Sequence, residues 1–189
     1  MDLNINYITK LYSIIFRMGN CLTQSLRSFK YIYNSYETRF LLSRNFDDLP
    51  MFGFIGTTVN AKVVEVYDGD TITIVFYYKG IPIKHRLRTE GYDSPELKPL
   101  KTIYNRDLHV RCGYIAKEYM SKLILNKVVK VVFNDKHNDK YGRLLGTIYD
   151  GNVNINQVMI DGGYGKTYDG GKKTEFSERD LLDIVNKGY

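Results

Sequence analysis

The stretch "AKVVEVYDGDTITIVFYYKGIPIKHRLRTE", residues 61–90, decides the fold. It alternates apolar and polar residues with the period of half-buried β-strands. The alternation predicts three consecutive strands, at residues 60–67, 71–78 and 81–90. Lys79-Gly80, between the second and third of them, is typical of a tight hairpin turn. The stretch therefore predicts a domain that opens with β-structure.

The residues that follow add helices and two more strands. A helix is predicted over 107–125, because Leu108, Cys112, Ile115, Tyr119 and Leu123 share one helical face. Two further strands are predicted at 128–134 and 143–149. A short helix is predicted at about 153–162, ending at Gly162-Gly163. A last helix is predicted to begin near Ser177, because Asp180 stands at capping-box spacing, and to end before Gly188. We therefore predict an α+β, mainly β fold: a five-stranded OB-fold Greek-key barrel with about three packed helices.

The first part of the chain has a different character. We divide the sequence into a leader, residues 1–57, partly helical or disordered, and an OB-fold domain, residues 58–189. Apolar residues at helical spacing predict a helix in the leader; they are Leu22, Leu26, Phe29, Tyr33, Tyr36 and Phe40. If translation starts at Met18, Gly19 becomes a myristoylation acceptor and Cys21 a palmitoylation candidate. That start would give membrane association and an anchored protein; the plainer alternative is that the helix packs on the barrel.

Composition restricts the partners. The formal net charge of +6 favours a polyanion, either nucleic acid or an anionic membrane surface. The two cysteines, Cys21 and Cys112, form neither a disulfide framework nor a zinc spacing, which indicates a reducing, cytoplasmic or intracellular location. No apolar run is long enough to span a membrane, and we predict a monomer.

Asp68-Gly69-Asp70 stands between the first two predicted strands. Asp-Gly is common in turns because both residues tolerate positive φ, so we expect Asp68 to shape the bend. Asp70 would then point inward as a ligand. An EF-hand is excluded, because the loop lacks its further acidic positions.

Three motifs together suggest a chemistry. "DSPE" offers Asp93 and Glu96 on a turn stiffened by proline, "KHRLR" offers Arg88 on a strand, and "DKYGR" offers Arg143 at the start of the fifth strand. Each motif alone is also an ordinary turn or a solvated strand. A hard cation such as Ca²⁺ could bind Asp70, Asp93, the Ser94 carbonyl and water, and would polarise a phosphoryl oxygen. Glu96 could orient or deprotonate a water, while Arg88 and Arg143 clamp the phosphate.

In this order, the segments "YDGDTITI", "HRLRTEGYDSPE", "DKYGRLLGTIY" and "NINQVMIDGGYGK" resemble the staphylococcal nuclease (thermonuclease) family over about residues 60–168. The resemblance implies a five-stranded OB barrel that cleaves phosphodiester bonds in DNA and RNA, usually with calcium. It implies Asp70, Asp93 and the Ser94 carbonyl as calcium ligands, and Arg88, Glu96 and Arg143 as catalytic residues. It also implies that Lys140 and Tyr141 contact the substrate, with Tyr168 near a second nucleotide-contacting tyrosine.

Two other classes of function compete with a calcium-dependent endonuclease. One is a non-catalytic module that binds nucleic acid or protein, but such nuclease-like domains usually lose the acids or arginines that are present here. The other is a membrane-associated adaptor driven by the basic leader, which leaves the acidic residues without a role. The sequence therefore favours the endonuclease.

Overall fold

The structure is a computed structural model that describes residues 35–49, 52–134, 139–171 and 173–187. The chain divides into two compact units, Met1–Met51 and Phe52–Tyr189. In the first unit, residues 35–42 form a helix, which includes the last positions of the predicted leader helix. The earlier positions of that helix, Gly19 and Cys21 all lie outside the described residues. In the ranges that the structure describes, no helix has both the length and the apolar character needed to cross a membrane.

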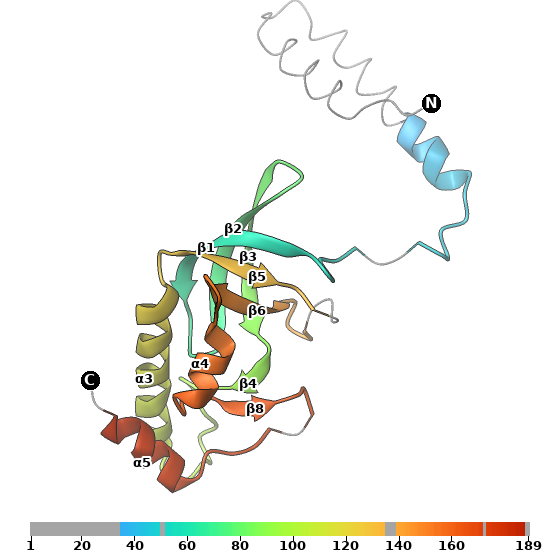
Figure 1. The fold of residues 1–189 in the computed structure, drawn as a ribbon. Coiled ribbons are helices and arrows are strands. Elements are labelled where there is room, and N and C mark those ends of the chain that lie inside the picture. The colour runs from blue at the N-terminus through green and yellow to red at the C-terminus, as the bar shows by residue number, and fades with distance from the viewer. Residues whose placement is uncertain (1–34, 50–51, 135–138, 172, 188–189) are drawn as a thin grey trace, which may run out of the picture. The chain divides into compact units, whose positions relative to one another are not determined.

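The second unit is built from short strands and helices (Figure 1). In chain order they are β1 (Thr58–Val66), β2 (Thr71–Tyr78), β3 (Ile81–Thr89), β4 (Gly91–Asp93), α3 (Arg106–Ile124), β5 (Val128–Val132), β6 (Leu144–Asp150), β7 (Val153–Asn154), α4 (Ile155–Asp161), β8 (Lys166–Tyr168) and α5 (Glu178–Asn186). The predicted elements agree with these bounds to within one or two residues at each end. The structure adds the short strands β4, β7 and β8.

Five strands close into a barrel. Strand β1 pairs antiparallel with β2 and β5, β2 pairs with β3, and β5 pairs with β6. The barrel closes where β3 runs parallel to β6, with Leu87 opposite Leu144. Lys79 and Gly80 both have positive φ, as a two-residue hairpin turn requires. The predicted five-stranded OB-type barrel is confirmed.

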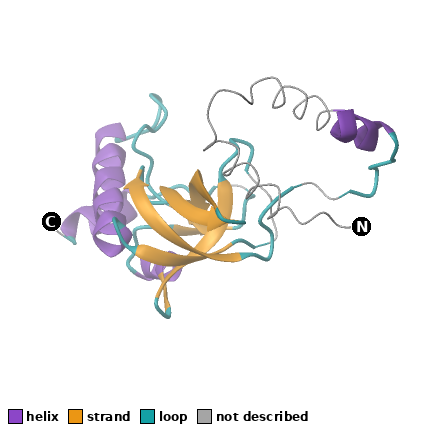
Figure 2. Ribbon diagram, turned by 90° about the horizontal axis from the view of Figure 1, so that it is seen from above, coloured by secondary structure: helices purple, strands orange, loops and turns teal. Residues whose placement is uncertain are grey.

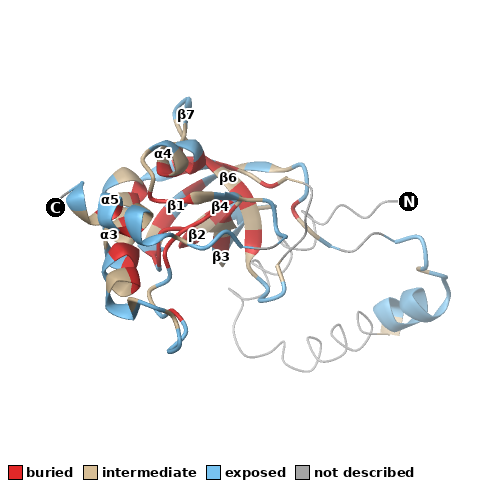
Figure 3. Cartoon of the chain, turned by 90° about the horizontal axis from the view of Figure 1, so that it is seen from below, coloured by how far each residue is buried: buried red, intermediate tan, exposed pale blue. Residues whose placement is uncertain are grey.

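The barrel interior holds the apolar side chains of the alternating strands. Ile72, Ile74 and Leu87 are fully buried there (Figure 3). Burying each such side chain contributes roughly 1.5–3 kcal/mol to the stability of the fold. Helices α3 and α5 lie together at one side of the barrel, and α4 packs against β6 (Figure 2).

Helix α3 buries a different face from the predicted one. Of the predicted apolar stripe, only Cys112 is fully buried, and the other members flank the core. The buried face consists of His109, Cys112, Gly113, Ala116, Met120 and Ile124. Small residues occupy its middle because the 94–96 segment approaches closely: a Cβ on Gly113 would lie 2.9 Å from the Glu96 carbonyl oxygen. The prediction followed the largest apolar residues and missed that close approach.

Strands β4 and β8 form a separate two-stranded sheet, with Gly91 opposite Tyr168 and Asp93 opposite Lys166. Each strand has only three residues, which is too few for an alternating pattern, so this sheet was not predicted. The predicted capping box of α5 is confirmed, since the Ser177 and Asp180 side chains bond each other's backbone N–H groups. The small sheet brings the residues after α4 next to the acidic turn that begins at Asp93.

Gly69 is needed because there is no room for a side chain at this position, and not because of its backbone conformation. Its φ is not positive, but a Cβ there would lie 2.8 Å from the Ser94 Cβ and 2.9 Å from the Ala116 Cβ. We predict that Gly69→Ala lowers the free energy of unfolding by about 1–3 kcal/mol, because the loop and helix must move apart. Urea denaturation measures this change. Gly171→Ala, on an exposed turn, is the control, and equal stabilities of the two variants would contradict the prediction.

Candidate active site

The turn between β1 and β2 presents two buried carboxylates. The Tyr67 N–H donates to the Thr71 carbonyl at 2.9 Å and closes the turn. Asp68 Oδ1 accepts a hydrogen bond of 3.0 Å from the Asp70 N–H, which is how Asp68 shapes the bend. The residues Asp68 and Asp70 are only 8% and 3% exposed.

Arg88 joins the two carboxylates that the sequence analysis chose as cation ligands. Its Nη1 donates to Asp70 Oδ1, and its Nη2 donates to Asp93 Oδ1 at 2.6 Å. Burial acts to lower the pKa of Arg88, but Asp70 and Asp93 outweigh it and raise the pKa above its ordinary value. The guanidinium is therefore a permanent charge that holds β2, β3 and β4 together.

The second oxygen of Asp70 faces Ser94. The Ser94 N–H and Oγ donate to Asp70 Oδ2 at 2.9 and 3.0 Å. The Thr71 hydroxyl donates to Asp70 Oδ1 at 3.0 Å. Asp70 is thus fixed from three sides, and Ser94 lies directly against it.

Arg143 reaches the same carboxylate indirectly. Its Nη1 donates to Thr71 Oγ1 at 2.8 Å, and Thr71 in turn donates to Asp70. Nε and Nη2 of Arg143 lie 2.7 and 2.6 Å from Asp139 Oδ2. Burial acts to raise the pKa of Asp139, but the hydrogen bonds from Arg143 and the turn backbone lower it overall. Asp139 therefore aims the guanidinium of Arg143.

Glu96 carries a partner that the sequence analysis did not anticipate. Lys173 Nζ lies 2.9 Å from Glu96 Oε1 and 2.9 Å from Asp93 Oδ1. Burial acts to lower the pKa of Lys173, and the two carboxylates raise it overall. The side chains of Glu96 and Lys173 are about half exposed, at 54% and 48%, so this pair lies at the edge of the site.

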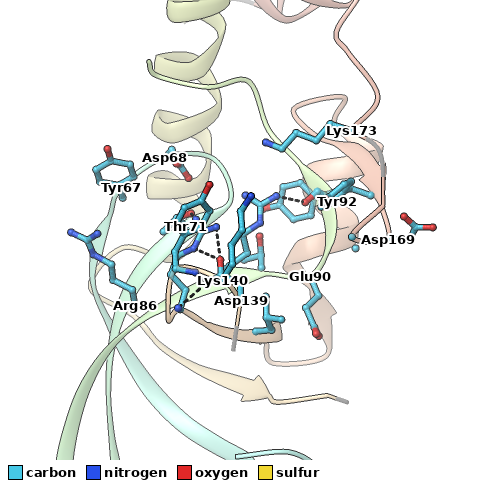
Figure 4. Close-up of a pocket in the computed structure, with 18 of the residues that line it drawn as sticks. Tyr67, Asp68, Thr71, Arg86, Glu90, Tyr92, Asp139, Lys140, Asp169 and Lys173 are labelled. Atoms are coloured by element: carbon cyan, nitrogen blue, oxygen red, sulfur yellow. Dashed lines mark hydrogen bonds and ion pairs between the residues drawn. The ribbon is translucent and has the colours of Figure 1, made fainter. Parts of the chain in front are cut away.

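A cavity of about 960 Å³ lies over these residues (Figure 4). Six of the sequence-predicted site residues line it: Arg88, Glu96, Lys140, Tyr141, Arg143 and Tyr168. Asp70 and Asp93 lie beneath, against Arg88, and Ser94 lies against Asp70. Among the sequence-predicted site residues, only Gly19 and Cys21 fall outside the described part of the chain. The structure thus brings the other nine to one place.

The charge of the site suits a hard cation. Burial, and then the charge of Asp70, raise the pKa of Asp68 to about 7. The described residues contain no group of three or more His, Cys, Asp or Glu side chains arranged to hold a metal ion. Calcium accepts carbonyl and water oxygens as well as carboxylates, so Asp70, Asp93 and the Ser94 carbonyl still fit it chemically.

Three residues that position the site were not predicted from the sequence: Asp139, Lys173 and Tyr92. The Tyr92 hydroxyl supports the acidic turn by donating to the Gly69 carbonyl at 2.7 Å. Asp139 could have been noticed, since it precedes Lys140 in the same hairpin. The role of Lys173 could not be predicted, because its contacts with Asp93 and Glu96 depend on where the segment after β8 lies in the folded chain.

Comparison with known proteins assigns the chain to a family. Residues 86–187 match the family described as staphylococcal nuclease homologue, and the chain belongs to that family. A protein of Escherichia coli named uncharacterized endonuclease is 32% identical over 113 residues, which cover 59% of this chain and 62% of that protein. A probable staphylococcal-like nuclease of Oryza sativa subsp. japonica is 36% identical over 97 residues, covering 50% of this chain and 22% of that protein. The chain thus spans less than two thirds of either relative.

The raised pKa of Asp68 has a consequence for stability. Because the fold raises the pKa of Asp68 from its ordinary value of 3.8 to about 7, the folded state holds an extra proton between these pH values. Stability therefore falls as pH rises through that window. We predict that Asp68→Asn, which keeps an acceptor for the Asp70 N–H, raises the free energy of unfolding above pH 7 by on the order of 2 kcal/mol in chelator. Thermal melts at pH 4 and pH 8 measure it, and an equal gain at both would exclude the charge as the cause.

Proposed function

We propose that this chain is a calcium-dependent phosphodiesterase, an endonuclease that hydrolyses DNA, RNA or both. One observation carries the proposal. Arg88 contacts Asp70 directly, Arg143 reaches it through Thr71, and both guanidinium groups line the cavity that Glu96 also lines. Two fixed cations beside an acidic group can stabilise the negative charge that develops on a phosphodiester during hydrolysis.

The two arginines would bind the phosphate. A guanidinium binds phosphate oxygens through parallel hydrogen bonds and keeps its charge at any working pH. Arg88 and Arg143 are both held by carboxylates, so each guanidinium would exchange part of that pairing for phosphate oxygens as negative charge develops on the phosphate. Their role is to stabilise that charge in the transition state.

Asp70, Asp93 and the Ser94 carbonyl would hold the calcium ion. When bound, calcium polarises a phosphoryl oxygen and so makes the phosphorus more electrophilic. The low exposure of Asp70 and Asp93 keeps bulk water from screening the site.

Glu96 would orient or deprotonate the attacking water. It lines the cavity on the segment that follows Asp93, and its side chain remains half exposed to solvent. A water molecule can therefore reach it. Lys173 holds the same carboxylate in the described structure, which fixes where Glu96 points.

Substrate contacts would come from the two tyrosines and the lysine at the cavity wall. Tyr141 is 72% exposed, and the Lys140 ammonium lies 5.1 Å from its ring centroid. An exposed ring beside a cation suits a nucleotide base and its phosphate. Tyr168 lines the cavity from β8. The printed names of the relatives, endonuclease and staphylococcal-like nuclease, support the same substrate class.

A non-catalytic nucleic-acid-binding module is the second candidate. The observation that favours it is the ion pair of Lys173 with both Asp93 and Glu96, because the ammonium occupies the Glu96 oxygen that an attacking water would otherwise contact. Such a chain would bind nucleic acid without cleaving it.

The assay that separates these functions uses the full chain and single-stranded DNA. We expect degradation with Ca²⁺ and none in excess chelator. Glu96→Gln should lower turnover by about 10²–10⁴-fold while leaving oligonucleotide affinity unchanged, because general base catalysis is lost and the shape is kept.

Glu118→Gln is the matched control. Its side chain is also 54% exposed but lies on α3, outside the cavity. Cleavage that persists in chelator would exclude the calcium requirement. Binding without any cleavage would establish the second candidate instead.

Arg143 offers a separate test of phosphate stabilisation. We predict that Arg143→Ala lowers turnover by about 10²–10³-fold, and that Arg143→Lys recovers little of it, because an ammonium cannot replace the planar fork. Initial rates at saturating substrate measure both variants. Asp139→Asn tests the aiming role and should lose less activity than Arg143→Ala. If Arg143→Lys matched the parent, a point charge would suffice and the fork would have no role.

A further inference from the structure

A second aromatic–cation unit lies in the same cavity, beyond the residues placed in the catalytic proposal. Tyr67 and Arg86 both line the cavity, and the Arg86 guanidinium carbon lies 5.7 Å from the Tyr67 ring centroid. The ring is 41% exposed, and Arg86 is exposed as well. Figure 4 shows this pair together at one side of the cavity. The backbone of Tyr67 is fixed by the turn hydrogen bond to Thr71.

Arg86 differs from the two proposed catalytic arginines in its charge balance. Arg88 and Arg143 each hold a carboxylate. Across the described residues, no carboxylate forms an ion pair with Arg86. Its charge is therefore available to an anion from solution without breaking an internal pair.

The unit repeats the arrangement at Tyr141. There, the Arg143 guanidinium carbon lies 5.4 Å from an exposed tyrosine ring. Each unit thus offers a ring for a base and a guanidinium for a phosphate.

The strand sets the distance between the phosphate positions. Arg86 and Arg88 lie two residues apart on β3, opposite Thr73 and Thr71. Two residues on a strand span roughly 7 Å, which is comparable to the separation of adjacent phosphates in an extended single strand.

Charged side chains of both signs line the cavity. Figure 4 places Tyr67, Arg86 and Asp68 on one side, and Asp169 and Lys173 on the other. Asp68 is buried, whereas Arg86 is exposed, and Lys173 is already paired with Asp93 and Glu96. A polyanion that continues past the arginines therefore meets, at Arg86, an exposed guanidinium that has no carboxylate partner among the described residues.

We propose that Tyr67 and Arg86 form a second nucleotide subsite, which binds the base and phosphate next to the scissile linkage of a single-stranded nucleic acid. This deepens the proposed function and rests on it for the position of the scissile phosphate. A substrate that fills this subsite must contain at least two nucleotides. Its strand would run along the cavity from Arg88 toward Arg86.

Binding of the full chain to a labelled single-stranded 12-mer in chelator tests the subsite without cleavage. We expect Arg86→Gln to weaken affinity at least threefold and to reduce the slope of log affinity against log salt by about 0.7, because one phosphate contact is lost. Tyr67→Ala should weaken affinity about fivefold or more, and Tyr67→Phe should retain it, because stacking needs only the ring. A mononucleotide should bind the parent and both subsite variants equally.

Lys130→Gln is the matched control, since Lys130 lies over the Tyr149 ring at 4.8 Å in a similar pair outside the cavity. If Arg86→Gln and Tyr67→Ala bind the 12-mer as Lys130→Gln does, or if the parent does not bind it, the subsite is wrong. If only Arg86→Gln weakens binding, the base-stacking half is wrong and no nucleotide subsite exists. A chain that shows the expected binding pattern but never cleaves would overturn the proposed function and leave the subsite standing. Repeating the binding measurement with a DNA 12-mer and an RNA 12-mer shows which of the two nucleic acids the subsite prefers.

Discussion

The ion pairs of Arg88 with Asp70 and Asp93 organise the whole site. Asp70 directly precedes β2, Arg88 lies on β3 and Asp93 ends β4, and the Arg88 side chain is only 11% exposed. Removing one partner of a buried ion pair is typically destabilising by about 3–5 kcal/mol, because the remaining charge is left without compensation. The barrel and the small β4–β8 sheet are therefore joined through charges that also define the proposed cation position.

The site contains more carboxylate groups than its fixed guanidinium groups can pair with. Asp68 shows this directly, since burial and the charge of Asp70 raise its pKa to about 7. A cation bound beside Asp70 would relieve this crowding of carboxylates, which supports the calcium site proposed above.

The barrel could be predicted from the sequence because its signals are local. Alternation located the strands, the Lys79-Gly80 turn defined the hairpin, and the Ser177–Asp180 capping box located α5. The charged side chains of the site were also recognisable, since they occur in short motifs. The close packing of α3, the β4–β8 sheet and the position of Lys173 were not predictable, because each depends on segments far apart in the chain approaching one another.

Arg88 and Lys173 differ in how firmly the site holds them. Arg88 is fixed, because it is buried and bonded to two carboxylates. Lys173 and Glu96 are both about half exposed, and ion pairs of that kind contribute only about 0–1 kcal/mol to stability. The ammonium can therefore leave Glu96 at little cost when a substrate phosphate arrives, and the buried Asp93 keeps its bond to Arg88. The internal pairing of Glu96 is thus compatible with catalysis, since the charge that restrains Glu96 is also the one most easily displaced.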